Sequence, residues 1–152
     1  MHKKILIIFW GHPLFDGRCM NMIDQLLIQN HKVIVLGVGQ KGGDLYYKNT
    51  QIKLFDSRLL SNSMTKYFKY FKYVKHFIQK TDMDIIIASD LYSMIPSVQT
   101  KNCHKAKILY DSRELYTKLA GLINKPLIQR IWAAYEKKYI LKVDYILVTV
   151  NI

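Results

Sequence analysis

The chain has 152 residues, 50% of them hydrophobic and 22% charged, which is typical of one globular domain and excludes a disordered or fibrous protein. No apolar run approaches the roughly 20 residues of a membrane span, and the amino-terminal run is too short for a secretory signal, so we expect a cytoplasmic protein. The net charge of +12 favours anionic partners such as a membrane surface, nucleic acid or phosphorylated substrates. Cys19 and Cys103 have no metal-ligand spacing, so neither a disulfide framework nor a metal site is indicated.

The amino-terminal third predicts alternating strands and helices. Residues 5–10 form an unbroken apolar run, the pattern of a central parallel strand covered on both faces. A polar, glycine-bearing loop and a helix with 3.6-residue periodicity follow, and residues 33–36 form a second strand, which implies a right-handed parallel crossover. Residues 40–49 are expected to be a loop, and residues 51–55 a short third strand.

The loop after the first strand contains three candidate site residues. Gly11 would let the backbone approach a ligand closely. His12 could serve as a general base or a ligand contact, although a histidine before a proline is also common in an ordinary loop. Arg18 lies near the expected helix start, where the helix dipole disfavours a cation. Because Gly11 and Gly17 do not have the G-x-G-x-x-G spacing, NAD binding is not predicted.

Residues 61–80 carry much of the positive charge, because lysines alternate with aromatic residues and no acid interrupts them. As a helix, the segment has an apolar stripe and lysine-rich flanks, which is typical of a contact with an anionic membrane surface. The alternative is a crossover helix packed on the sheet with a solvated lysine face. Nucleic acid is a disfavoured partner because no recognisable nucleic-acid module accompanies the segment. The candidate membrane contacts are Lys66, Lys69, Phe71, Lys72 and Lys75.

The remaining chain continues the alternation of strands and helices. A fourth strand is expected over residues 84–88, a helix from residue 91, a fifth strand over 108–110, a helix over 127–141 and a sixth strand over 144–150. On the last helix, the residues expected to face inward are Ile128, Ile131, Trp132, Tyr135, Tyr139 and Ile140. The predicted fold is α/β and Rossmann-like: one doubly wound, mainly parallel sheet of about six strands with helices on both faces.

Charged residues follow the fourth and fifth strands directly. Asp90 ends the fourth strand, and Asp111, Arg113 and Glu114 follow the fifth. Carboxyl ends of parallel strands meet at one edge of the sheet, where open α/β sheets bind ligands, so these groups should converge there. The alternative is that Asp111 caps the next helix while Arg113 and Glu114 form a solvated ion pair.

The order of these motifs resembles the amino-terminal half of family-four-like glycosyltransferases with the GT-B architecture. The likeness is carried by Arg18 after the first strand, by Ser89-Asp90-Leu91, by the residues from Tyr110 to Leu115, and by the segment from Trp132 through Val150. Many members have His-Asp where this chain has Ser89-Asp90, and a histidine where it has Arg113. No imidazole role is therefore carried over, whereas the guanidinium could bind an anionic group of acceptor or donor.

The resemblance implies a larger enzyme with two Rossmann-like domains, of which residues 1–152 are the acceptor-binding domain. A carboxyl-terminal domain, absent from this chain, would bind the nucleotide-sugar donor, and neither a metal nor another cofactor is implied. The implied reaction is retaining transfer to a saccharide or lipid-linked acceptor in cell-envelope polysaccharide assembly, with this half alone inactive. No catalytic residue is assigned; the implied acceptor contacts are Gly11, His12, Arg18, Asp90, Asp111, Arg113 and Glu114.

Two further interpretations remain open. The chain could be a non-catalytic basic α/β module that binds an anionic membrane surface, such as the inner face of the plasma membrane, or nucleic acid. It could also be another Rossmann-like enzyme, a reading weakened by the missing dinucleotide fingerprint. If a partner domain is absent, uncovered apolar surface would favour a dimer of the isolated domain.

Overall fold

A computed structural model describes residues 1–59, 64–113 and 125–148. They form one seven-stranded sheet in the order β3-β4-β2-β1-β5-β6-β7, in which only β3 is antiparallel to its neighbour. The strands are β1 (Lys4–Ile8), β2 (Lys32–Gly39), β3 (Gly43–Tyr47), β4 (Thr50–Asp56), β5 (Ile85–Ala88), β6 (Lys107–Ser112) and β7 (Tyr145–Val148). The α-helices are α1 (Gly17–Ile28), α2 (Thr65–Lys80), α3 (Leu91–Gln99) and α4 (Pro126–Ile140), and the short 3-10 helices are η1 (Pro13–Phe15), η2 (Ser57–Leu59) and η3 (Lys101–Cys103). The predicted α/β, Rossmann-like fold is confirmed.

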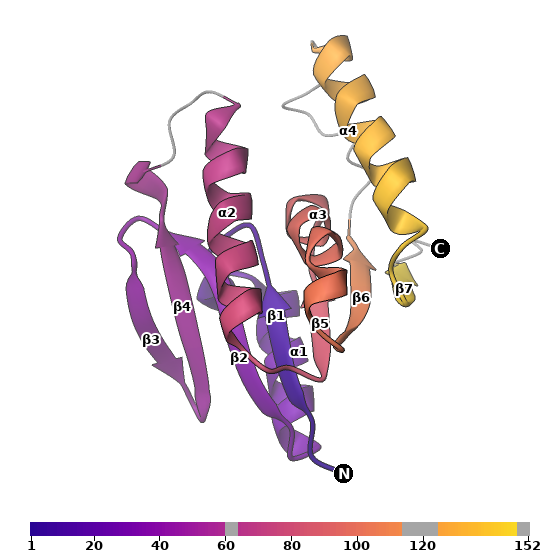
Figure 1. Cartoon of the computed structure of the whole chain (residues 1–152). Helices are drawn as coiled ribbons and strands as arrows, with labels where there is room; N and C mark the ends of the chain where they lie inside the picture. The colour runs from indigo at the N-terminus through magenta and orange to yellow at the C-terminus, as the bar shows by residue number, and fades with distance from the viewer. Residues whose placement is uncertain (60–63, 114–124, 149–152) are drawn as a thin grey trace.

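Helices cover both faces of the sheet, as Figure 1 shows: α1 lies on one face, and α2, α3 and α4 lie on the other. Side chains alternate between the faces along a strand. In β1, Ile5 and Ile7 pack with α1, whereas Leu6 and Ile8 pack with the three-helix layer. Both faces of β1 are therefore buried, which explains why its sequence is an unbroken apolar run.

One predicted loop is a strand. Residues 40–49 contain β3, which forms a hairpin with β4 and makes seven strands rather than about six. Lys48 completes the turn with a φ of 50°, in the left-handed region. The residues of β3 are mostly exposed, so no alternation of apolar and polar positions marked the strand.

Helix α2 uses its aromatic stripe to pack on the sheet. Tyr70, Phe71, Val74 and Ile78 are buried there, and Phe71 is only 7% exposed. The prediction that Phe71 contacts a membrane is wrong, because the Phe71 ring belongs to the core between the sheet and the three-helix layer. The outward side keeps the lysines, as the crossover-helix alternative predicted. Within the described residues, no helix combines the length and hydropathy needed to cross a bilayer.

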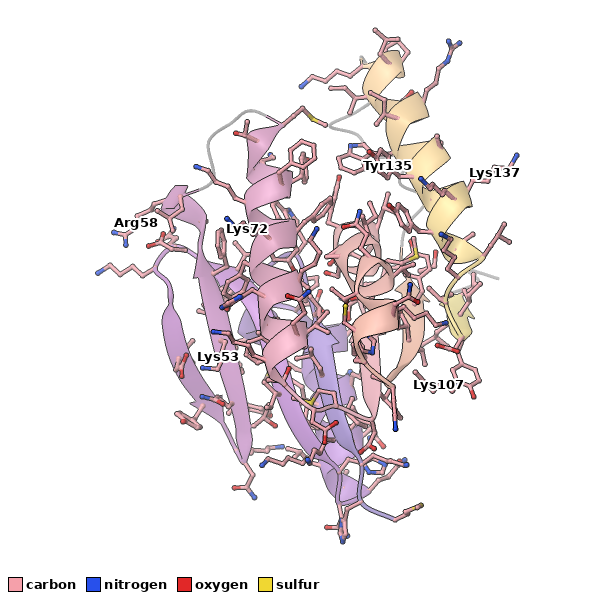
Figure 2. The ribbon with its side chains drawn as sticks, viewed as in Figure 1. Lys53, Arg58, Lys72, Lys107, Tyr135 and Lys137 are labelled. Carbon is pink, nitrogen blue, oxygen red and sulfur yellow. The ribbon has the colours of Figure 1, made fainter. Side chains whose placement is uncertain are left out.

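Helix α4 buries a narrower face than predicted. Trp132 and Tyr139 are buried as expected, but Ile131 is 44% and Tyr135 37% exposed. The reason is that α4 packs on α3, a slender helical neighbour, and not over a broad sheet surface. Figure 2 shows Tyr135 extending from α4 toward α2, while Lys137 on the same helix points away.

Candidate functional site

The candidate residues gather at the carboxyl edge of the parallel strands. Gly11, His12 and Arg18 come from the segment between β1 and the first turn of α1. Asp90 lies two residues after the end of β5, Asp111 is the penultimate residue of β6, and Arg113 directly follows that strand. Glu114 lies outside the described residues. The rule that strand ends share one edge therefore placed these segments correctly.

A network of ion pairs joins three of these segments. The Asp111 carboxylate is fully buried and accepts hydrogen bonds from Arg18 Nη2 and from Arg113 Nε, the latter at 3.0 Å. Arg113 Nη1 also donates to Asp16 Oδ1 at 2.7 Å. The same Asp16 oxygen caps α1 by accepting the backbone N–H of Cys19 at 2.6 Å. The network therefore ties β6 to the start of α1.

The two guanidinium groups in this network are balanced by two carboxylates. Burial alone would lower the pKa of Arg113, but Asp16 and Asp111 raise it above its ordinary value, so the side chain is charged. Its guanidinium carbon lies 4.9 Å from the centroid of the Phe9 ring. Because Arg18 and Arg113 already pair with carboxylates, an anionic ligand would have to compete with Asp111 for them.

One donor of the network has no partner. Arg113 is 89% buried by side-chain area, since 11% is exposed, and its Nη2 finds no hydrogen-bond acceptor among the described residues. An unpaired buried donor is costly, and a ligand oxygen would satisfy it. A neutral hydroxyl group can do so without adding charge to the balanced network.

Asp90 is a buried carboxylate that holds two backbone segments at the carboxyl edge of the sheet. It is 5% exposed; its Oδ2 accepts the Trp10 backbone N–H at 2.6 Å, and its Oδ1 accepts that of Ser93 at 2.8 Å. Burial raises the pKa of Asp90 and the two amide donors lower it, so that the pKa is about 6. In this structure both oxygens hold the backbone of neighbouring segments, and the carboxylate does not face solvent.

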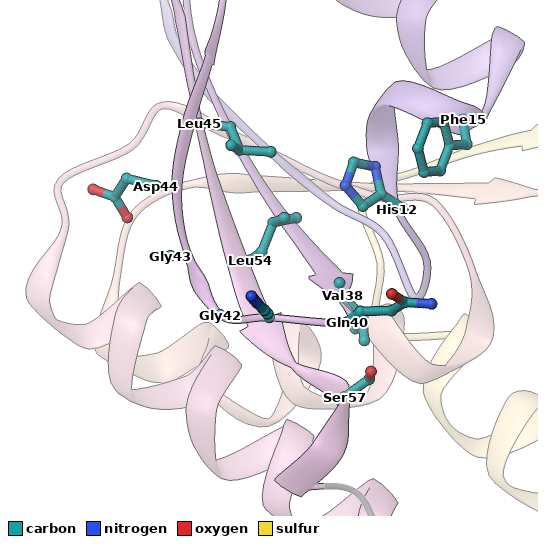
Figure 3. Close-up of a pocket in the computed structure, with 12 residues that line it drawn as sticks. His12, Phe15, Val38, Gln40, Gly42, Gly43, Asp44, Leu45, Leu54 and Ser57 are labelled. Carbon is teal, nitrogen blue, oxygen red and sulfur yellow. The ribbon is translucent and has the colours of Figure 1, made fainter.

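A cavity of about 700 Å³ opens on the other side of the β1–α1 segment. Its walls come from η1, the end of β2, the β3 hairpin and the end of β4, and they include His12, Phe15, Val38, Lys41, Leu45, Leu54 and Ser57. In Figure 3 the rings of His12 and Phe15 lie together on one wall, with Val38 and Leu54 opposite. The two rings stack with centroids 4.3 Å apart, and Phe15 is 86% exposed. This combination of apolar walls and a few polar groups is typical of a small-molecule site.

The histidine in the wall also has an unsatisfied atom. His12 Nδ1 is buried and has no hydrogen-bond partner in the described part of the chain. The ring therefore offers a polar atom beside the apolar surface of Phe15. A ligand carrying both an apolar face and hydroxyl groups would complement this wall.

Gly11 has a packing role in this structure. A Cβ atom there would lie 2.7 Å from Cε1 of Phe9, the ring that supports Arg113. Its carbonyl accepts the backbone N–H of Val38 at 2.8 Å, which joins the β1 exit loop to β2. Gly11 thus holds the wall between the cavity and the ion pairs.

Several residues of the site were not predicted. Asp16 was passed over, although an aspartate just before a helical stretch is a recognised N-cap signal. Phe15 and the cavity wall from residue 38 to 45 were missed because they carry no motif and their segment was expected to be a loop. Within the described ranges, no cluster of three or more His, Cys, Asp or Glu side chains could hold a metal ion.

Comparison with known proteins identifies the fold. No family model matches the sequence, and no curated protein matches it. Among solved structures, sucrose-phosphate synthase from Thermosynechococcus elongatus superposes on 97% of this chain and 42% of its own, with a TM-score of 0.70 and 13% identity. The enzyme WbmH of Bordetella bronchiseptica, in complex with NAD+, is matched over 95% of this chain and 54% of its own (TM-score 0.56, 11% identity). A dTDP-glucose 4,6-dehydratase from Bacillus anthracis, in complex with NAD, is matched over 94% and 53% (TM-score 0.52, 15% identity).

At these identities the similarity is one of fold, and it places the chain among Rossmann-like α/β proteins. The chain spans about half the length of the structures it matches, or somewhat less for the synthase.

Proposed function

We propose that this chain is the acceptor-binding half of a retaining glycosyltransferase with GT-B architecture. The complete enzyme would transfer a sugar from a nucleotide-sugar donor to a saccharide or lipid-linked acceptor in cell-envelope polysaccharide assembly. The observation that carries the proposal is the cavity lined by His12 and Phe15, which belong to the same β1–α1 segment as Asp16 of the Asp16–Arg113–Asp111 network. The motif order from Arg18 to Val150 and the fold similarity to sucrose-phosphate synthase support it.

The chemistry of the site suits a sugar acceptor. A sugar ring presents C–H groups that can pack on an aromatic face and hydroxyl groups around its rim. Phe15 and His12 would supply the face. His12 Nδ1 and Arg113 Nη2, which lack partners among the described residues, would bond hydroxyl oxygens on either side of the β1–α1 segment. The charge balance around Arg113 favours neutral groups over phosphate at that point.

In this proposal the chain contributes positioning. The acceptor oxygen would bond to the anomeric carbon of the donor while the bond from that carbon to the nucleoside diphosphate breaks, and the hydroxyl proton would pass to an oxygen of the departing phosphate. Holding the acceptor oxygen in line for this step can supply a large part of the rate enhancement. No residue of this half is assigned as the base.

The dinucleotide-binding alternative has less support from the residues. Enzymes of that type place a G-x-G-x-x-G turn after β1 and an acidic residue after β2 to bind the ribose. Here the turn lacks that spacing, and β2 ends in Gly39 followed by Gln40 and Lys41.

The test is a transfer assay with the complete gene product, a panel of nucleotide sugars, and saccharide and lipid-linked acceptors. Phe15→Ala should raise the acceptor KM about tenfold with an unchanged donor KM, because it removes the aromatic face. Tyr46→Ala is the matched control, since Tyr46 is also an exposed aromatic residue (72%) but does not line the cavity. Absence of transfer with every donor, or equal effects of the two variants, would contradict the proposal.

A further inference from the structure

Large apolar side chains are exposed at the amino-terminal ends of α2 and α4. Phe68 is 65% and Leu127 73% exposed, and Met64 and Ile131 are exposed as well. Apolar side chains gathered on a surface commonly mark a binding site. We call Met64, Phe68, Leu127 and Ile131 the helix tip.

The two halves of the helix tip lie at the same edge of the molecule. In Figure 1, α2 and α4 both begin at the edge toward which the parallel strands point. The rings of Tyr67 in α2 and Trp132 in α4 contact each other with centroids 4.9 Å apart, so the first turns of α2 lie beside the first half of α4. The helix tip therefore stands at the edge that also holds the candidate site.

Cations are the sequence neighbours of the helix tip. Lys66 and Lys69 flank Phe68 on α2, while Lys125 and Arg130 flank Leu127 on α4. Helix α2 has five lysines and no acid, and the one acid of α4, Glu136, accepts a hydrogen bond from Tyr110 at 3.0 Å. The charges around these apolar side chains are thus of one sign over the described part of both helices.

The positive surface continues along α2. A groove of about 680 Å³ between α2 and the end of α3 is lined by Lys69, Lys72, Lys75 and His76, among others, and by no acidic residue. These lysines belong to the outward stripe of the helix, since its apolar stripe is buried against the sheet. The groove offers several ammonium groups to phosphate oxygens at one place.

We propose that the helix tip docks on the surface of an anionic lipid bilayer. The apolar side chains would enter the boundary between head groups and acyl chains, and the neighbouring cations, with Lys69 and Lys72 at the near end of the α2 groove, would contact lipid phosphates. A bilayer fits better than a flat protein partner because the apolar groups stand on the ends of two helices whose described charged side chains are all cations, apart from Glu136, which is paired with Tyr110. Three of the predicted contacts, Lys66, Lys69 and Lys72, keep their role in this proposal, whereas Lys75 lies further along α2; Phe68 takes the role of the buried Phe71.

The first test measures sedimentation of the 152-residue chain with vesicles. Binding is expected with vesicles that contain phosphatidylglycerol and not with pure phosphatidylcholine. Phe68→Ser and Leu127→Ser should each weaken binding about tenfold. Their controls are Ile28→Ser and Leu141→Ser, because Ile28 (71%) and Leu141 (84%) are as exposed but end α1 and α4 at the opposite edge.

Charge is tested in the same way. Lys66→Gln and Lys69→Gln should each weaken binding about fivefold, whereas Lys32→Gln, an exposed lysine that begins β2 at the opposite edge, should not. Insertion is tested with Phe68→Trp and Leu141→Trp and lipids brominated on the acyl chains. Only the tryptophan at position 68 should show added quenching above the background of the native tryptophans.

The proposal would be overturned by equal loss in tip and control variants, or by salt-sensitive binding that is indifferent to Phe68 and Leu127. A preference for an oligonucleotide or a protein partner over anionic vesicles would overturn it too. The substituted residues are exposed, except Lys66, which is partly buried, so far-ultraviolet circular dichroism should confirm an unchanged fold. Because no sugar or donor enters the assay, its outcome is separate from that of the proposed transferase.

Discussion

Replacement of Arg113 by leucine should destabilise the domain through the ion-pair network. Arg113 joins Asp16 to Asp111, and its side chain is 11% exposed. Leucine keeps some apolar contact with Phe9 but removes the two guanidinium donors, Nε and Nη1, that bond to Asp111 and Asp16. Asp111 remains fully buried, and among the described residues it keeps only the hydrogen bond from Arg18.

The magnitude follows from what is left unpaired. Leaving a buried charge without its partner costs about 3–5 kcal/mol. Here Arg18 still neutralises Asp111, and the Cys19 amide still bonds Asp16, so we expect about 2–3 kcal/mol. Arg113→Lys should fall between wild type and Arg113→Leu, because an ammonium keeps the charge but cannot span both carboxylates.

Urea denaturation followed by the fluorescence of Trp10 and Trp132 measures this change. Arg58→Leu is the matched control, since the Arg58 side chain is 66% exposed and loss of its pair with Asp56 should cost no more than about 1 kcal/mol. If Arg113→Leu unfolds at the wild-type midpoint with the same slope, the network does not stabilise the edge of the sheet and the reasoning fails.

Three other substitutions test separate parts of the structure. Burial raises the pKa of Asp90 to about 6, so the folded protein binds a proton at this carboxyl more tightly than the unfolded chain does. The free energy of unfolding should therefore decrease as the pH rises from about 4 to about 6. Urea titrations at several pH values should show a flatter dependence of this free energy on pH for Asp90→Asn. Gly37→Ala would place a Cβ 2.4 Å from Cδ of Pro13, so its thermal midpoint should fall, with a cost of about 1–3 kcal/mol; a wild-type midpoint would contradict the close packing of η1 on β2. Phe71→Ala should cost about 3–5 kcal/mol in urea denaturation, whereas Phe68→Ala should leave stability unchanged, and the reverse order would show that the assignment of the two faces of α2 is wrong.

The central strands were predictable because their physical demands are simple. A parallel strand covered on both faces must be apolar throughout, and β1 and β5 are such runs. Strand β3 was missed because it lies at an edge, where Gly43 and Asp44 are tolerated and hydrogen bonds to β4 alone keep it extended. Its existence depends on its partner more than on its own residues.

For the site, the positions of the charged residues could be predicted, but their pairing could not. Strand ends located Asp90, Asp111 and Arg113, since polar groups cannot continue into a core without partners. Which groups pair is decided by tertiary structure: Arg113 meets Asp16 across a separation of 97 residues. No local pattern reports that contact, nor the burial that turns Asp90 into a backbone anchor.

The short segment between β1 and α1 has two sides with different duties. Phe15 forms part of the cavity wall, and the very next residue, Asp16, holds Arg113 and the first turn of α1. A molecule that shifts the backbone at Phe15, and not only its exposed ring, would also move the peptide unit that carries Asp16. Through that shared backbone, occupation of the cavity would weaken or strengthen the Asp16–Arg113 ion pair.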